Sequence, residues 1–199
     1  MVARFLFMRH GEAEHNVAYR SVGDAAFCDP AFKDARLTDE GCNQCNETGE
    51  SQSAVFKQFD AIYTSPLTRC IQTAVLMKQW IPSENFNAND ALIERRGGGH
   101  ICNVRRERDA IKAEFAEHGL NCDLLAETDE DWSDREPLQF VESRIVMFLR
   151  DLLTLYADSE ASILVVTHHD VLYVLLGGVN IKNADTIVLD ADELRELLY

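Results

Sequence analysis

The stretch Arg4-Phe5-Leu6-Phe7-Met8-Arg9-His10-Gly11-Glu12 decides the fold. Its apolar run is short and a turn-forming glycine follows almost at once, which predicts a buried strand. In open α/β sheets, ligands bind beyond the carboxyl ends of the strands. The strand therefore places a cation and an imidazole, Arg9 and His10, at the mouth of a site. An ordinary strand end with a solvated Arg-His pair would carry the same residues.

A second strand far along the chain repeats this arrangement. Ile163-Leu164-Val165-Val166-Thr167 is a continuous apolar run that ends in His168. Such runs are typical of strands buried on both faces of a mostly parallel sheet. Between the two runs, a third short strand from Ala61 leads through Pro66 into a helix start that carries Arg69. The pattern therefore brings two imidazoles and two guanidinium groups toward one edge of a sheet.

With these residues the chain resembles the histidine phosphatase superfamily, which includes the phosphoglycerate mutase-like enzymes. Five motifs carry the resemblance in the family's order, from residue 4 to 170: Arg9-His10-Gly11-Glu12 with Asn16, Leu37-Thr38-Asp39-Glu40-Gly41, Ser65-Pro66-Leu67-Thr68-Arg69 with Gln72-Thr73-Ala74, Leu92-Ile93-Glu94, and Val166-Thr167-His168. The resemblance implies one phosphoglycerate mutase-like domain over residues 1–199. Alternating strands and helices independently predict a three-layer α/β fold, with helices on both faces of a mostly parallel sheet. We expect residues 95–135 to form a cap-like insertion.

Composition limits the function further. The chain has 199 residues, 46% hydrophobic and 27% charged, with a formal net charge of -15. This acidity argues against nucleic acid and anionic membrane partners, and no apolar stretch approaches a membrane span. The six cysteines fit a reducing compartment, so we expect a cytoplasmic protein. Cys42 and Cys45 form a C-x-x-C pair without a second pair at zinc spacing, which we interpret as incidental helix cysteines.

Periodicity and turn residues place the other elements. We expect a loop over 17–36 that walls the site, a helix over 39–47 capped by Thr38, a helix ending at Trp80, and a strand over 86–93. Charges at helical spacing mark 105–118, and 127–136 is an acidic surface run. A long helix over 136–156 presents one apolar face made of Val141, Ile145, Phe148, Leu152 and Leu155. A short helix over 171–176, a strand over 186–189 and a helix over 192–198 complete the chain.

The resemblance assigns the chemistry to particular residues. His10 is the expected nucleophile, Glu94 the general acid, and His168 a further catalytic residue that also contacts phosphate. Arg9 and Arg69 supply guanidinium forks that match two phosphate oxygens. Asn16 and the backbone N–H of His169 are further expected phosphate ligands, although the family commonly has glycine at position 169. Glu12 can orient a phosphate ligand or simply favour the turn, and His15 and His100 are expected on the surface.

These residues predict a metal-independent phosphomonoester hydrolase that acts on a small phosphate ester through a phosphohistidine, without a cofactor. The alternatives are a cofactor-dependent phosphoglycerate mutase and a catalytically poor phosphate-binding scaffold. Mutases of the family carry a tyrosine where this chain has Gly97, after Glu94-Arg95-Arg96, which favours hydrolysis. Arg95, Arg96, Arg105, Arg106 and Arg108 are interpreted as a solvated helix face; if they line the pocket, the substrate carries a second anionic group. The sequence leaves the natural substrate and oligomeric state open.

Overall fold

A five-stranded sheet in the order β3-β2-β4-β1-β5 forms the centre of the molecule. The structure is a computed structural model that describes residues 2–129 and 133–198. The strands are β1 (Arg4–Arg9), β2 (Ala61–Thr64), β3 (Phe86–Ala88), β4 (Ser162–Thr167) and β5 (Thr186–Asp190). Neighbouring strands are parallel except β5, which pairs antiparallel with β1. The mostly parallel sheet expected from the sequence is confirmed.

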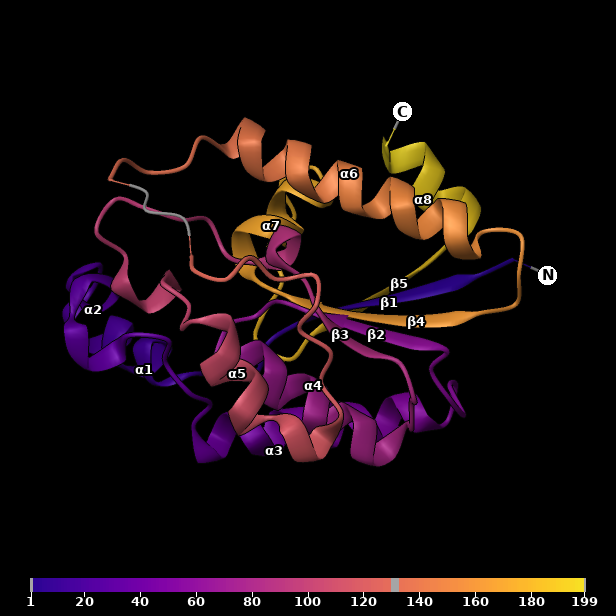
Figure 1. The fold of residues 1–199 in the computed structure, drawn as a ribbon, viewed down its shortest axis with the longest axis horizontal. Helices are drawn as coiled ribbons and strands as arrows, with labels where there is room; N and C mark the ends of the chain where they lie inside the picture. Colours follow the sequence, from indigo (N-terminus) through magenta and orange to yellow (C-terminus); the bar gives the residue numbers. More distant parts are fainter. Residues whose placement is uncertain (1, 130–132, 199) are drawn as a thin grey trace.

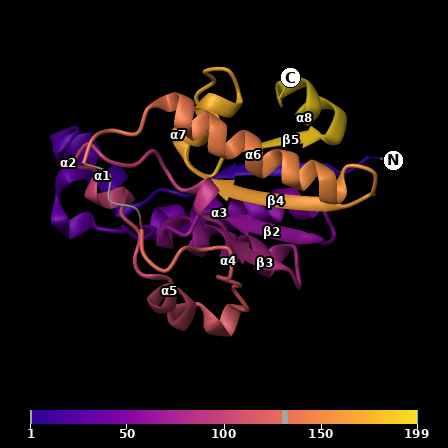
Figure 2. The same ribbon diagram turned by 45° about the horizontal axis from the view of Figure 1, so that its top comes forward.

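Helices cover both faces of the sheet, as the three-layer prediction required (Figure 1). They are α1 (Glu14–Val22), α2 (Ala25–Cys28), α3 (Asp39–Ser53), α4 (Thr68–Trp80), α5 (Arg108–Glu114), α6 (Leu138–Tyr156), α7 (His169–Leu175) and α8 (Ala191–Leu198), with 3-10 turns η1 (Pro30–Phe32), η2 (Asp90–Leu92), η3 (Ile101–Asn103) and η4 (Ala116–His118). Helices α6, α7 and α8 lie on one side, and α3, α4 and α5 on the other. The arrowhead of β4 points toward α1 and α2 in Figure 2, so these helices lie beyond the carboxyl ends of the parallel strands.

The unbroken apolar run of β1 follows from this layering. Successive side chains of a strand point to opposite faces. Leu6 and Met8 pack into the core cluster shared with α3 and α4, whereas Phe5 and Phe7 pack into the cluster shared with α6, α7 and α8. Both faces are buried, so the four inner positions from Phe5 to Met8 are apolar and the arginines fall at the two ends of the strand.

Helix α3 is longer than the sequence predicted. Thr38 is its N-cap, as expected, and the Oγ1 atom of Thr38 accepts a hydrogen bond from the Gly41 N–H at 2.9 Å. The helix continues through Gly49 to Ser53 instead of ending near residue 47. A side chain at Gly49 would place its Cβ 2.5 Å from the Trp80 ring. This glycine therefore permits close packing of α3 on α4 and does not end the helix.

Three other expectations about secondary structure were wrong. The segment 17–36 is not a loop, because α1, α2 and η1 occupy most of it. The expected strand over 86–93 ends at Ala88, and η2 then turns the chain back so that Leu92 is buried. The apolar face of α6 includes Leu149 in place of Leu155, which is 65% exposed.

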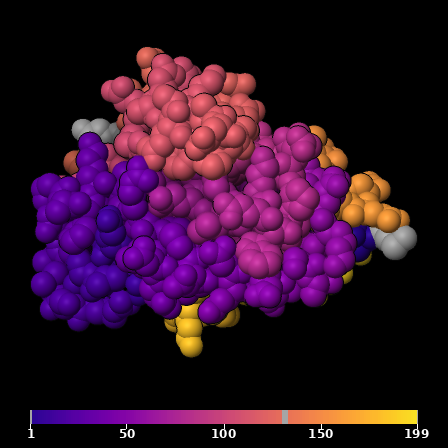
Figure 3. Space-filling view, turned by 90° about the horizontal axis from the view of Figure 1, so that it is seen from below, coloured from indigo at the N-terminus to yellow at the C-terminus, as the bar shows by residue number. Residues whose placement is uncertain are grey.

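The segment 95–135 folds into η3, α5 and η4 with connecting turns, as far as the structure describes it. Figure 3 shows its salmon-coloured part protruding from the body of the molecule. Its arginines do not form the solvated helix face expected from the sequence. The Arg105 side chain is fully buried and binds Asp90 at 2.9 Å, and Arg106 binds Asp34 at 2.9 Å. These ion pairs fasten the segment to the domain.

Of the other arginines in this group, Arg96 is buried against Asp129 and Arg95 donates to the Glu136 carbonyl at 2.6 Å. Only Arg108, whose side chain is 37% exposed, resembles the expected solvated position. The expected acidic surface run over 127–136 lies partly outside the described residues. Its last member, Glu136, is buried and paired with Arg144 at 3.0 Å, so that end of the run is not on the surface.

Candidate active site

The pairing of β1 with β4 brings the ends of the two histidine-bearing strands together. Arg9 lies opposite Thr167 in the parallel register, and the His10 N–H donates to the Thr167 carbonyl at 3.1 Å. The His10 and His168 rings meet edge to face, with centroids 5.1 Å apart. Both histidines are buried. The two imidazoles expected at one sheet edge are therefore neighbours.

The His10 ring is held in one orientation. Its Nδ1 atom lies 2.7 Å from the Gly11 carbonyl oxygen. Because a carbonyl only accepts hydrogen bonds, Nδ1 carries the proton and Nε2 keeps a free lone pair. Burial, followed by the charges of Arg69 and Arg9, lowers the pKa of His10 well below its usual value. The ring is therefore neutral, and Nε2 is available as a nucleophile.

Close backbone packing supports this geometry. A Cβ at Gly11 would lie 2.5 Å from the Gly41 carbonyl oxygen and 2.7 Å from the Cys45 sulfur. A Cβ at Gly41 would in turn lie 2.0 Å from the Glu12 carbonyl oxygen. The turn after β1 thus packs directly on the start of α3. Cys45 is buried in this packing, and its thiol is free.

Arg9 and Arg69 both line the pocket in front of His10. Arg9 donates from Nη1 to the Ile181 carbonyl at 2.7 Å. Arg69, which is 1% exposed, donates from Nη1 to the Cys102 carbonyl at 2.8 Å and from Nη2 to the Asn103 Oδ1 at 2.9 Å. The Nε of each arginine is buried without a hydrogen-bond partner in the described chain. The Nε atoms of Arg9 and Arg69 are therefore two charged donors that can bind an anionic acceptor.

His168 lies behind this pair and does not line the pocket. Its Nδ1 accepts from Arg69 Nη2 at 3.3 Å, so Nε2 carries the proton and donates to the Ser65 Oγ at 2.7 Å. Burial and then the charge of Arg69 lower its pKa well below the usual value. In this arrangement the neutral His168 ring orients Arg69 and packs against His10.

Glu94 reaches the pocket because η2 redirects the chain after β3. Thr167 fastens that turn by donating from its hydroxyl to the Leu92 carbonyl at 2.8 Å. The Glu94 carboxyl is nearly buried and accepts from the Arg95 N–H at 2.8 Å. Burial, reinforced by the negative charge of Asp170, raises its pKa. A carboxyl group with a raised pKa can hold a proton for transfer nearer neutral pH.

His15 is a site residue that the sequence interpretation missed. It was expected on the surface, but it is 5% exposed and lines the pocket. The Asn16 Oδ1 accepts from the Ala13 N–H at 3.0 Å, so the nitrogen of the Asn16 amide is the atom 3.1 Å from His15 Nε2. Nε2 must therefore accept, and the proton resides on Nδ1, which is buried without a partner among the described residues.

The environment of His15 keeps it uncharged. Burial, with the charges of Arg69 and Arg9, lowers its pKa to about 2. His15 is thus a neutral N–H donor in a cationic pocket. Asn16 also lines the pocket, as expected of a phosphate ligand, and its amide fixes the His15 ring. Glu12 instead binds Arg20 at 2.6 Å and Thr38 at 2.9 Å outside the pocket lining, which favours its structural interpretation.

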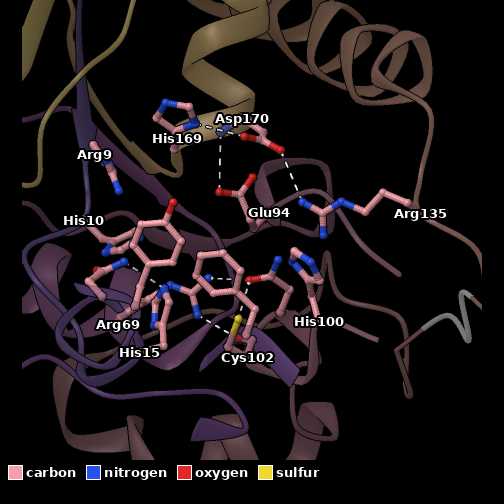
Figure 4. A pocket seen from close by; sticks show the side chains of 14 residues that line it. Arg9, His10, His15, Arg69, Glu94, His100, Cys102, Arg135, His169 and Asp170 are labelled. Atoms are coloured by element: carbon pink, nitrogen blue, oxygen red, sulfur yellow. Dashed lines mark hydrogen bonds and ion pairs between the residues drawn. The ribbon is translucent and has the colours of Figure 1, made fainter. Parts of the chain in front are cut away.

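His169, Asp170 and Arg135 form the opposite side of the pocket (Figure 4). His169 Nδ1 lies 2.9 Å from Asp170, and this hydrogen bond raises the pKa of His169. The second carboxylate oxygen of Asp170 lies 3.4 Å from Arg135 Nη2. Arg135 was not singled out from the sequence. Arg95, Arg96, Arg105, Arg106 and Arg108 are absent from the described lining of this pocket.

The cavity has a volume of about 330 Å³. Tyr19, Phe27 and His100 complete much of its wall. His100, which was expected on the surface, is partly exposed and lines the pocket. The expectation that segment 17–36 walls the site is met by α1 and α2. Across residues 2–129 and 133–198, no His, Cys, Asp and Glu side chains form a group of three that could hold a metal ion. Within these ranges no helix has the length and apolarity needed to cross a membrane.

Solved structures of known proteins share this fold. An ecdysone phosphate phosphatase of Bombix mori superposes with a TM-score of 0.69 at 14% identity, covering 94% of this chain and 88% of that chain. A phosphoglycerate mutase of Bacillus anthracis superposes with a TM-score of 0.62 at 18% identity, covering 98% and 96%. The predicted phosphoglycerate mutase-like fold is confirmed by both.

Sequence relatives match over a shorter length. A probable phosphoglycerate mutase of Arthroderma benhamiae is 30% identical in an alignment of 125 residues that covers 54% of this chain and 37% of that protein. A 2,3-bisphosphoglycerate-dependent phosphoglycerate mutase of Zymomonas mobilis is 31% identical over 109 residues, 52% of this chain and 42% of that protein. The matches thus span less than half of these relatives. The family model of the histidine phosphatase superfamily (branch 1) matches residues 5–197, and the chain belongs to that superfamily.

Proposed function

We propose that the protein is a phosphomonoester hydrolase that works through a phosphohistidine on His10 and needs no metal or other cofactor. The observation that carries the proposal is a neutral His10 in a fixed tautomer, placed in one pocket with two guanidinium groups that have unpartnered Nε donors. Phosphoryl transfer requires an in-line nucleophile and neutralisation of the phosphate charge. These three side chains supply both requirements without a cation from solution.

In the first step, the lone pair of His10 Nε2 attacks phosphorus and the bond from phosphorus to the ester oxygen breaks. Arg9 and Arg69 bind the phosphate oxygens through their buried Nε donors, which have no partner among the described residues. Asn16 and the Nδ1–H of His15 donate to the same group. The Nδ1–H of His10 stays bound to the Gly11 carbonyl, which stabilises the positive charge that the ring gains on phosphorylation.

The leaving alkoxide takes its proton from Glu94. Burial and Asp170 raise the pKa of this carboxyl, so it keeps a proton nearer neutral pH than an exposed glutamate does. In the second step, the Glu94 carboxylate removes a proton from water, the water oxygen attacks phosphorus, and the bond to Nε2 breaks. Inorganic phosphate leaves, and the electron pair returns to a neutral His10. The same carboxyl thus serves as acid and then as base.

His168 and His169 support this centre in different ways. We assign His168 to the orientation of Arg69 and to packing against the His10 ring, on the contacts described above. The backbone N–H of His169, at the first position of α7, remains our proposed additional phosphate ligand. Residues 95–135 act as the cap, because His100, Cys102, Asn103 and Arg135 lie along the pocket. The six free thiols fit a reducing compartment, and we propose the cytoplasm as the location.

Phosphoglycerate mutase activity is the second candidate, favoured by the names of the sequence relatives. A mutase must shield its phosphohistidine from water until the acceptor binds. In this chain the segment after Glu94 contains Gly97, Gly98 and Gly99, all with positive φ. These three positions offer no side chains to close the pocket. Water access to the phosphohistidine therefore favours hydrolysis.

The test is a panel of phosphate monoesters assayed with a chelator present, alongside interconversion of 2- and 3-phosphoglycerate with 2,3-bisphosphoglycerate supplied. We expect release of inorganic phosphate that the chelator does not reduce, and loss of nearly all of it in His10→Ala. Efficient interconversion with little phosphate released would overturn hydrolysis in favour of the mutase. Absence of both activities in a folded protein would overturn the catalytic proposal.

A further inference from the structure

Three aromatic side chains form a continuous wall along the pocket. We call Tyr19, Phe27 and His100 the aromatic wall. The rings of Tyr19 and Phe27 are stacked, with centroids 5.0 Å apart and planes at 11°. The His100 ring lies 5.0 Å from that of Phe27. All three residues line the cavity that contains His10, so a group attached to the bound phosphate meets these rings.

The wall is built from two separate parts of the chain. Tyr19 belongs to α1 and Phe27 to α2, whereas His100 precedes η3 in the proposed cap. A Cβ at Gly99 would come within 3.7 Å of the Cys28 sulfur, which places the cap backbone directly against α2. Phe27 also contacts His15, whose ring centroid is 6.0 Å away. The wall therefore extends from the phosphate end of the pocket to the cap.

The pairing of the charged groups in the pocket leaves little positive charge to bind a second anionic group on the substrate. Arg135, the third guanidinium group in the lining, is already paired with Asp170, and His169 binds the other oxygen of that carboxylate. The two guanidinium groups with unpartnered Nε atoms, Arg9 and Arg69, match the two negative charges of a phosphate monoester. A second anionic group on the substrate would have to displace Asp170 from Arg135.

We propose that the natural substrate is a phosphate monoester of an uncharged alcohol that carries a planar aromatic ring, and that the ring stacks against the aromatic wall. This inference rests on the proposed function, because it concerns the leaving group of the same reaction. Aromatic rings attract each other in offset or edge-on arrangements beyond the effect of buried area. A saturated ring of equal size buries the same area but lacks this attraction.

The test compares benzyl phosphate with cyclohexylmethyl phosphate. Both esters release a primary alkoxide and differ in the ring alone. The phenyl ring makes the benzyl alkoxide a slightly better leaving group, and this small effect is the same in wild type and in the variants below. We expect kcat/KM for the benzyl ester to exceed that for the cyclohexylmethyl ester by about 2- to 10-fold. We also expect 3-phosphoglycerate to be the poorest of the three substrates. A benzyl-to-cyclohexylmethyl ratio near one, or a preference for 3-phosphoglycerate, would overturn the inference.

Substitutions in the aromatic wall test whether it produces the preference for the benzyl ester. Tyr19→Leu with Phe27→Leu should bring the ratio of the two kcat/KM values close to one, and the use of a ratio cancels any general damage to the centre. Phe140→Leu is the matched control, since Phe140 is 49% exposed on α6 outside the pocket lining; it should keep the wild-type ratio. A wild-type ratio in the double variant would refute the assignment of the wall.

Failure of the proposed function gives a different result. In that case neither ester releases phosphate and His10 is never phosphorylated. Calorimetric binding of benzylphosphonate and cyclohexylmethylphosphonate, which cannot be hydrolysed, then measures the same ratio without turnover. Tighter binding of the benzyl compound by wild type, lost in Tyr19→Leu/Phe27→Leu, would support the wall. Equal binding of the two phosphonates would reject it.

Discussion

Replacing Arg69 with lysine separates the geometry of its guanidinium group from its charge. Arg69 binds the Cys102 carbonyl at 2.8 Å, the Asn103 side chain at 2.9 Å and His168 at 3.3 Å, and still has a free Nε. Lysine ends in one nitrogen and cannot span these acceptors and a phosphate together. A hydrogen bond from a charged group contributes about 1.5–3 kcal/mol.

If the transition state loses one such bond of about 2–3 kcal/mol, kcat/KM falls by about 30- to 150-fold, since 1.36 kcal/mol is tenfold. The assay is steady-state kinetics on an alkyl phosphate, with thermal unfolding to establish that Arg69→Lys is folded. Arg108→Lys is the matched control, because Arg108 is partly exposed and lies outside the pocket lining. Kinetics of Arg69→Lys within about twofold of the control would refute the contact between the Arg69 guanidinium group and the phosphate.

Three further outcomes follow from the pocket. Glu94→Gln should lower kcat/KM about 10²- to 10⁴-fold with benzyl phosphate and only slightly with 4-nitrophenyl phosphate, whose leaving group departs unprotonated. Equal losses with both esters would reject the assignment of Glu94 as general acid. Because the pKa of Glu94 is raised, the carboxyl loses its proton only as pH rises through that raised pKa. The wild-type rate on an alkyl ester should therefore fall as pH passes this value. A pH profile without this decrease at higher pH would count against the assignment of Glu94 as the acid. His15→Phe keeps a ring but removes the Nδ1 donor, so calorimetry should give inorganic phosphate binding weaker by about 5- to 10-fold, from one lost hydrogen bond; undiminished binding would remove His15 from the site.

The sequence predicted the parts of the fold whose residues are buried on both faces. Strands β1 and β4 were found from their apolar runs alone, and the ends of those runs located Arg9, His10 and His168. Helix α1 was missed because His15 is its one buried residue. A helix that turns a single side chain inward has no apolar periodicity to detect.

The missed site residues depend on contacts between distant parts of the chain. His15 gains its role from Phe27 and from the arginines that depress its pKa, and nothing beside it in the sequence indicates burial. Arg105 and Arg106 were misinterpreted for the same reason, because their partners Asp90 and Asp34 lie far from them in sequence. Charged residues cannot be recognised as buried before their partners are known.

Direct detection of the covalent intermediate tests the central claim. Wild-type protein is mixed rapidly with a radiolabelled phosphate ester, quenched in base, which preserves phosphohistidine, and mapped by mass spectrometry. The account predicts a phosphoryl group on His10 that forms and decays at rates sufficient for turnover, and no label in His10→Ala. Label on another residue, or an unlabelled protein during a confirmed burst of alcohol release, would contradict it.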